Sequence, residues 1–209
     1  MGAFAICEGD APKQKSAEEK DERLGACEAL MRMNYNRGLG ATPWVKLYKR
    51  ELILRHPFPE KQIYEDLAVL YQIVGDCDSV AIGGRKVYYW VQRKGSTMRM
   101  KFDERQMAAM DAVAAQFQYV QTKYPAALDS VKYRYAAKAI ELMAVCFHSG
   151  GDRTVFQTLR KHMKKYIKDM LRDKKAKPTM KARAIAAALG YYPAKLVFTM
   201  HEKAKRSFS

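Results

Sequence analysis

The chain has 209 residues and a formal net charge of +16, with 48% apolar and 29% charged residues. This length allows one large domain or two small ones, and the apolar share can fill a buried core. No stretch approaches the roughly 20 consecutive apolar residues of a membrane-spanning helix, and the apolar N-terminus lacks the basic segment of a secretory signal. We therefore expect a soluble chain rather than a membrane-spanning or secreted one.

The cysteines and histidines do not indicate a metal site. The four cysteines are widely separated without a CxxC pair, and no histidine has a second ligand at helical spacing. Zinc sites need such closely spaced ligands. The sequence therefore predicts no metal bound by these residues, and reduced, mostly buried thiols in a cytoplasmic protein.

The positive charge is concentrated in the second half of the chain. Residues 101–209 hold 22 Lys and Arg against 9 Asp and Glu, a net charge of +13, whereas residues 1–100 carry +3. A basic field favours nucleic acid, anionic lipid or phosphorylated ligands, and composition does not distinguish them. The change in composition also places a candidate domain boundary near residue 101.

The start of the chain predicts one helix and one strand. A capping box over residues 16–19 predicts a helix that runs to about Asn34. Residues 44–48 have the pattern of a short strand, and a helical turn is expected over residues 50–54.

The next segment predicts a helix followed by a hairpin. From Tyr64 the apolar residues recur at i, i+3, i+4 and i+7, which predicts a helix that ends at Gly75. Residues 79–83 and 86–92 are rich in β-forming residues and flank a Gly-Gly-Arg turn, which predicts a β-hairpin.

From residue 103 the pattern becomes helical. Helices are expected after Asp103, Pro125 and Gly151, followed by two shorter helices bounded by Pro178 and Pro193. The helix after Gly151 should bury one apolar stripe, which comprises Val155, Leu159, Met163, Ile167 and Leu171. The cations of residues 160–177 should then lie on its opposite face, either as a plain solvated surface or as a surface for anionic lipid head groups.

These patterns together predict an α/β region over residues 1–100 with a short β-hairpin, followed by an all-α, basic C-terminal region over residues 101–209. Three groups of residues in the first region could carry chemistry. Glu65 and Asp66 open the helix after Tyr64. Two carboxylates at this position are either an ordinary helix cap or a general base that projects into a cleft.

The second group follows the aromatic residues of the expected hairpin, and comprises Gln92, Arg93, Lys94 and Ser96. Two cations beside a Gly-Ser turn suit a diphosphate clamp, but they also suit a solvated hairpin end. The third group is Trp44, Lys46 and Tyr48. An aromatic ring with a lysine can bind a sugar, although a tryptophan is also a common core residue.

Five short segments occur in an informative order and spacing. They are WVKLYKREL at residues 44–52, FPE at 58–60, IYEDL at 63–67, YY at 88–89 and QRKGS at 92–96. Together they resemble the acceptor-side half of bacterial family 2 nucleotide-sugar glycosyltransferases, which have the GT-A fold. The resemblance covers about 80 residues well and the remainder of the chain loosely.

The resemblance implies that a sugar is transferred from a nucleotide-sugar donor to a hydroxyl of a sugar or lipid-linked acceptor, in surface polysaccharide synthesis. It implies that Asp66 is the catalytic base and that Glu65 supports it. The diphosphate would be bound by Gln92, Arg93, Lys94 and Ser96. The acceptor side would be lined by Trp44, Lys46 and Tyr48.

The family's nucleotide-binding half and its Asp-x-Asp metal motif have no counterpart in residues 1–40. The complete family implies a divalent metal, Mg²⁺ or Mn²⁺, whereas we expect no cofactor in this chain. We expect a truncated gene product, a split subunit or a cloned fragment that is inactive alone. A separate chain would then carry the nucleotide-binding half.

A second hypothesis is a non-catalytic basic helical module that binds nucleic acid or an anionic membrane surface. The sequence has no helix-turn-helix, RNP, KH or zinc signature, so we expect no specific nucleic-acid target. A cytoplasmic location, peripheral at the inner face of the membrane, is expected.

Overall fold

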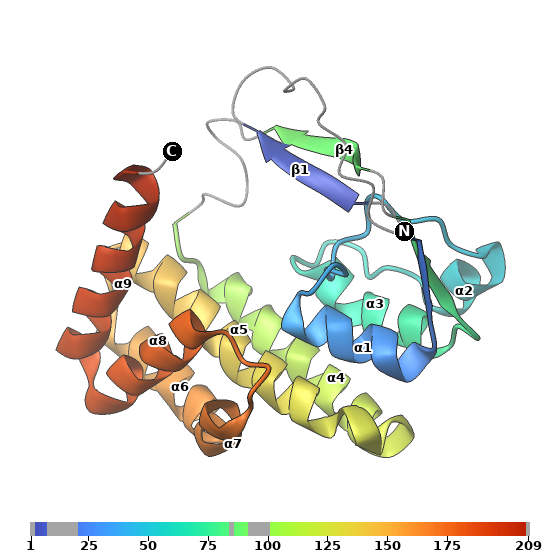
Figure 1. Cartoon of the computed structure of the whole chain (residues 1–209). Coiled ribbons are helices and arrows are strands. Elements are labelled where there is room, and N and C mark those ends of the chain that lie inside the picture. The colour runs from blue at the N-terminus through green and yellow to red at the C-terminus, as the bar shows by residue number, and fades with distance from the viewer. Residues whose placement is uncertain (1–2, 8–20, 84–85, 92–100, 208–209) are drawn as a thin grey trace.

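The computed structural model describes residues 3–7, 21–83, 86–91 and 101–207, and the described chain is mostly helical (Figure 1). The helices are α1 (Ala26–Tyr35), α2 (Arg50–Arg55), α3 (Glu65–Gly75), α4 (Ala108–Lys123), α5 (Leu128–His148), α6 (Arg153–Lys164), α7 (Ile167–Arg172), α8 (Pro178–Leu189) and α9 (Tyr191–Ser207). The strands are β1 (Ala3–Cys7), β2 (Glu22–Leu24), β3 (Val80–Ile82) and β4 (Lys86–Val91). Short 3-10 helices, η2 (Glu104–Met107) and η3 (Pro125–Ala127), precede α4 and α5.

Helix α5 lies at the centre of the molecule, with α1, α3 and α4 to one side and α6 to α9 to the other (Figure 1). It contacts α1, α4, α6, α7, α8 and α9. One buried cluster includes Tyr35 of α1 and Leu67 of α3 together with apolar residues of α4 to α9. Residues before and after position 101 therefore share one core.

The predicted β-hairpin over residues 79–92 is wrong. Strand β3 pairs antiparallel with β2, so that Leu24 lies opposite Val80, and β4 pairs in parallel with β1. Alternating apolar residues identify a strand but not its partner. The pairing of β3 with β2 is favoured because it buries both Leu24 and Val80 against α1 and α3.

Two other expectations for the first half are also wrong. Residues 22–24 form a strand, and α1 begins only at Ala26, after Gly25 in an extended conformation. The capping box at residues 16–19 lies outside the described residues. The segment 44–48 is an irregular loop rather than a strand, and Val45 has a φ of 63° that is incompatible with extended backbone.

The helical C-terminal region is confirmed, with two differences in detail. The helix expected after Gly151 is divided into α6 and α7 at Tyr166. Helix α9 begins at Tyr191, after Gly190 with a φ of 145°, so Pro193 lies within its first turn. A proline is tolerated there because the first-turn N–H groups have no partner within the helix.

The basic face of α6 and α7 is in part as expected. Leu159 and Met163 are buried, whereas Val155, Ile167 and Leu171 are only half-buried. The exposed cations of this face are Lys161, Lys164, Lys165, Lys168 and Arg172. Arg160 differs, because its guanidinium donates hydrogen bonds to the carbonyls of Ala187 and Ala188, at 2.9 and 2.5 Å. It satisfies carbonyl groups at the C-terminal end of α8, where a helix lacks its own donors.

Asp76 joins the end of α3 to α2 and α4. Its carboxylate accepts hydrogen bonds from Tyr119 and His56, both at 2.8 Å, and lies 3.4 Å from the ammonium of Lys123. Burial alone raises the pKa of Asp76, but the bonds from Tyr119, His56 and Lys123 outweigh it and lower the pKa below its usual value. Asp76 therefore stabilises the fold above the unfolded-state pKa of about 3.9, and this contribution is lost as the pH falls through the lower folded-state value.

We expect Asp76→Asn to lower the free energy of unfolding by about 2 kcal/mol at neutral pH, since hydrogen bonds to charged groups contribute about 1.5–3 kcal/mol. The difference from the wild type should shrink as the pH falls below about 4. Urea unfolding at several pH values measures both effects. The matched control is Asp78→Asn, because the Asp78 side chain is 94% exposed and lies 3.8 Å from Lys49. An equal loss of stability in both variants would contradict this assignment.

Candidate functional site

The loop of residues 42–48 is closed by its own polar side chains. The ammonium of Lys46 donates a hydrogen bond to the carbonyl of Thr42 at 2.5 Å. The hydroxyl of Tyr48 donates one to the carbonyl of Pro43 at 3.0 Å. These bonds fix the turn that contains Trp44, so Lys46 and Tyr48 shape the loop as well as lining its surface.

Trp44 stacks on Tyr88 of β4, with ring centroids 5.0 Å apart and planes inclined by 27°. Trp44 is half-buried and Tyr88 is 39% exposed. The stack therefore presents aromatic surface to solvent, which is the kind of surface on which the apolar face of a sugar ring can pack. It also connects the loop to the strand that leads toward residue 92.

Asp66 lies in the first turn of α3. The helix starts after Tyr64, whose φ of 62° turns the chain sharply into the helix. One oxygen of Asp66, Oδ1, accepts the backbone N–H of Leu67 at 2.6 Å. The other oxygen accepts no hydrogen bond from the residues that the structure describes, so this carboxylate retains capacity to accept a further proton donor.

The charge of Asp66 raises the pKa of both Lys46 and Tyr48, so the three side chains are close enough to interact electrostatically. Burial raises the pKa of Asp66, opposed mainly by its hydrogen bond to Leu67. Burial lowers the pKa of Lys46 to about 8, although the carboxylate of Asp66 raises it in part. Burial and Asp66 together raise the pKa of Tyr48.

A carboxyl with a raised pKa beside a lysine with a lowered pKa is a pattern common at functional sites. Both shifts bring the groups closer to neutral pH, where proton transfer is most effective. The arrangement can accept a proton from a hydroxyl at Asp66 and hold an anionic or polar group at Lys46.

Helix α5 supplies charged groups that the sequence reasoning missed. Lys138 is 8% exposed, its ammonium lies 2.6 Å from Glu141, and it lies 5.3 Å from the ring centroid of Tyr64. Arg134 lies 3.3 Å from the same Glu141 carboxylate. Charged residues at positions 134, 138 and 141 share one face of a largely apolar helix. This spacing is the sequence signal that could have identified them as a buried charged group.

These α5 charges influence one another and Asp66. Burial lowers the pKa of Lys138, against the attraction of Glu141. Burial alone raises the pKa of Glu141, but Lys138 and Arg134 outweigh it and lower the pKa to about 2. Lys138 and Arg134 also lower the pKa of Asp66, in opposition to burial and to the negative charge of Glu65.

The remaining predicted residues fall into two groups. Glu65 is half-buried beside Asp66 and acts on it through its charge. The predicted diphosphate group, Gln92, Arg93, Lys94 and Ser96, lies outside the described residues. The expectation that Arg93 lies close to Asp66 therefore stays a prediction.

The described residues do not fit the divalent metal that the resemblance implies. Among them, no group of three or more His, Cys, Asp and Glu side chains is arranged to hold a metal ion. Asp76 and Asp78 have Asp-x-Asp spacing, but Asp76 is occupied by Tyr119, His56 and Lys123, and Asp78 is 94% exposed.

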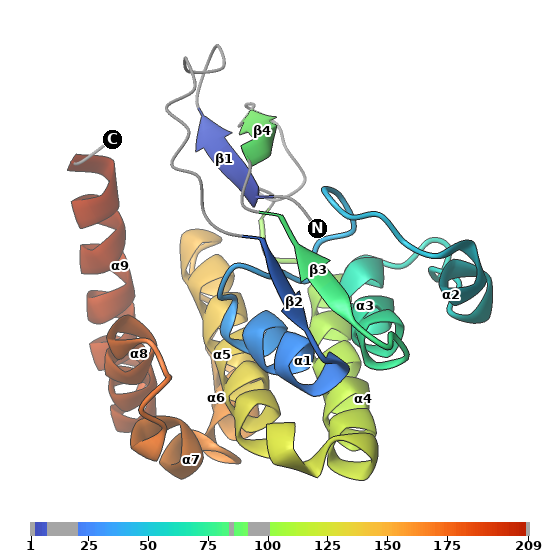
Figure 2. The ribbon, with the colours of Figure 1, turned by 45° about the vertical axis from the view of Figure 1, so that its right-hand side comes forward.

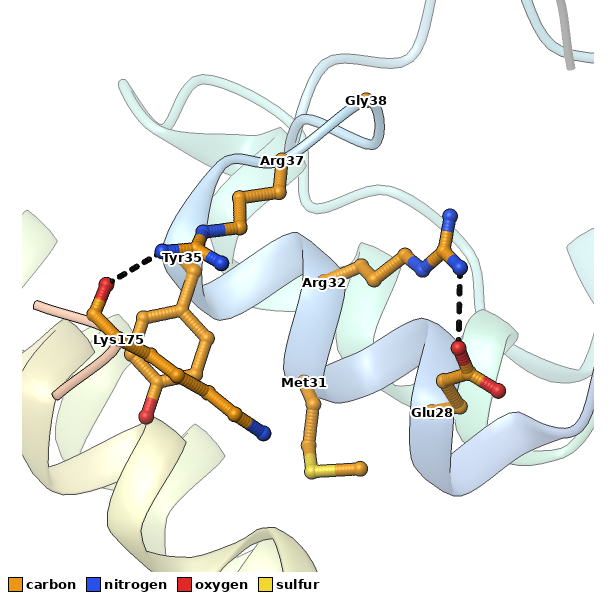
Figure 3. Close-up of a pocket in the computed structure, with 7 residues that line it drawn as sticks. All are labelled: Glu28, Met31, Arg32, Tyr35, Arg37, Gly38 and Lys175. Carbon is orange, nitrogen blue, oxygen red and sulfur yellow. Dashed lines mark hydrogen bonds and ion pairs between the residues drawn. The ribbon is translucent and has the colours of Figure 1, made fainter.

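A hollow of about 610 Å³ lies between α1 and the segment before α8, away from the predicted residues (Figure 3). Arg37 donates a hydrogen bond to the carbonyl of Lys175 at 2.8 Å, and Tyr35 donates one to Asp173 at 2.6 Å. Arg32 is already paired with Glu22 and Glu28. These contacts make the hollow a junction between the two halves of the chain.

We expect the Lys46 ammonium to titrate with a pKa of about 8, well below the value of about 10.4 for an exposed lysine. In the Asp66→Asn variant the pKa of Lys46 should be lower still, because the substitution removes the carboxylate that partly offsets the effect of burial on this pKa. NMR of reductively methylated protein measures both values, with Asp78→Asn as the matched control. A Lys46 pKa that Asp66→Asn leaves unchanged would contradict the proximity of these groups.

Within the described part of the chain, no helix is both long and apolar enough to cross a membrane. Comparison with known proteins found no matching protein-family model, no matching curated protein and no matching solved structure.

Proposed function

We propose that the chain provides the acceptor side of a glycosyltransferase site, where Asp66 acts as the general base. The acceptor hydroxyl loses its proton to Asp66 as its oxygen attacks the anomeric carbon of a nucleotide-activated sugar. The new glycosidic bond forms as the bond to the diphosphate breaks, and the configuration at the anomeric carbon is inverted.

One observation carries this proposal: the half-buried carboxyl of Asp66 interacts electrostatically with Lys46 and Tyr48, which belong to the same loop as Trp44 of the Trp44–Tyr88 stack. A raised pKa makes Asp66 a stronger base while it remains ionised. The stack supplies a surface for a sugar ring. The Asp66 oxygen that accepts no hydrogen bond within the described part of the chain can accept a hydroxyl proton.

Other residues support the same role. Glu65 adds negative charge that keeps the pKa of Asp66 raised, while Lys138 and Arg134 limit that rise. These opposing charges suit a base that must be ionised before the reaction and protonated after it. Gln92, Arg93, Lys94 and Ser96 would hold the departing diphosphate, as the family resemblance implies.

We expect the purified chain alone to transfer no sugar. Added to an extract of its native cells in which its gene has been deleted, the chain should restore sugar transfer. Asp66→Asn should lower the restored rate by roughly 10²–10⁴-fold, the usual contribution of a positioned base. Incorporation of labelled sugars from a panel of nucleotide-sugars measures the rate. Trp44→Ala should instead raise the acceptor KM.

The matched control is again Asp78→Asn, which should restore transfer as well as the wild type does. Circular dichroism confirms that each variant is folded. Full activity of Asp66→Asn would contradict its role as the base. Turnover by the purified chain alone would contradict the need for a separate nucleotide-binding half.

A further inference from the structure

The outer faces of α8 and α9 carry large apolar side chains that the rest of the described chain leaves uncovered. Leu189 is 73% exposed, Tyr192 is 69% exposed, and Leu196 and Met200 are each 62% exposed. Figure 2 shows α8 and α9 at one edge of the molecule, with α9 outermost. We call Ile185, Leu189, Tyr192, Leu196 and Met200 the α8–α9 apolar stripe.

Helix α9 is apolar on two opposite sides. Its inner side buries Ala194 and Phe198, which join the main core. Tyr192, Leu196 and Met200 follow one another at intervals of four residues and so form a single row. At about 100° per residue, Leu196 points roughly opposite to Phe198. A surface helix normally places polar residues on that outer side, so the row is an exposed apolar face, in which Tyr192 alone also contacts Arg153 among the described residues.

Positive charge accompanies the stripe. Lys195 is exposed beside Leu196. The sequence adds Lys203, Lys205 and Arg206 to the last turns of α9, against the single acid Glu202. The whole chain carries +16, so its field reinforces this local excess.

We propose that the α8–α9 apolar stripe docks on the surface of an anionic lipid bilayer. The apolar row would enter the boundary between head groups and acyl chains, and the flanking lysines would contact the anionic head groups. Tyrosine suits this boundary because its ring is apolar and its hydroxyl is polar. An anionic surface fits because the charges in and after the row are mostly positive, with Lys195, Lys203, Lys205 and Arg206 against Glu202.

This surface differs from the basic face of α6 and α7, whose exposed cations are Lys161, Lys164, Lys165, Lys168 and Arg172. Binding through cations alone is lost when salt screens the charges. Binding through the stripe has an apolar component, which salt does not weaken. The two modes can therefore be separated by salt and by uncharged substitutions.

The test is co-sedimentation of the full chain with vesicles of phosphatidylcholine alone, or of phosphatidylcholine mixed with phosphatidylglycerol. We expect binding to the mixed vesicles that high salt reduces but does not abolish. The double substitution Leu196→Gln with Met200→Gln should weaken binding roughly tenfold or more, because it removes two apolar side chains from the row. Lys195→Gln should weaken it at low salt only.

The matched control is Thr158→Gln, an exposed polar position on α6 outside the stripe, which should bind as the wild type does. The substituted side chains contribute little to the core, so the variants should unfold at nearly the same temperature as the wild type. Thermal unfolding measures this. Equal binding by the double variant and the wild type would overturn the proposal. So would a failure to bind phosphatidylglycerol vesicles, or a self-association in sedimentation velocity that the double substitution abolishes.

Discussion

The burial of α5 is the constraint on which the rest of the structure depends. Twelve of its 21 residues are buried, more than a helix with one apolar face can hide. The other helices must therefore surround it, and any polar group it carries inside needs a partner. Ser130 accepts a hydrogen bond from Asn34 of α1 at 2.9 Å, and Asn34 in turn accepts one from Gln116 of α4 at 2.7 Å.

The same constraint extends to the candidate site. The side chain of Lys138 is buried and its ammonium is paired with the partly exposed Glu141, because an unpaired buried ammonium would be costly. From α5 it contacts Tyr64 and acts on Asp66, although both belong to the first half of the chain. The ionisation of the proposed base therefore depends on residues from both sides of the change in composition near residue 101.

Helix α9, at the edge of the molecule, is covered by other helices on one side only, unlike α5. Its inner side is held by contacts of Phe147 with Tyr191 and Phe198, whose ring centroids lie 5.4 Å away in both cases. Its outer row of Tyr192, Leu196 and Met200 is mostly exposed instead. The proposed site and the proposed membrane surface thus lie on different elements, and each can fail without the other.

Most of the helices could be predicted from the sequence, because periodic apolar residues and the glycines and prolines at helix ends act locally. The candidates Asp66, Lys46 and Trp44 also came from the sequence. The pairing of β3 with β2, the loop at residues 44–48 and the influence of Lys138 and Arg134 on Asp66 became evident only in the folded chain. Strand partners and electrostatic neighbours are set by contacts between distant segments, which periodicity within one segment does not specify.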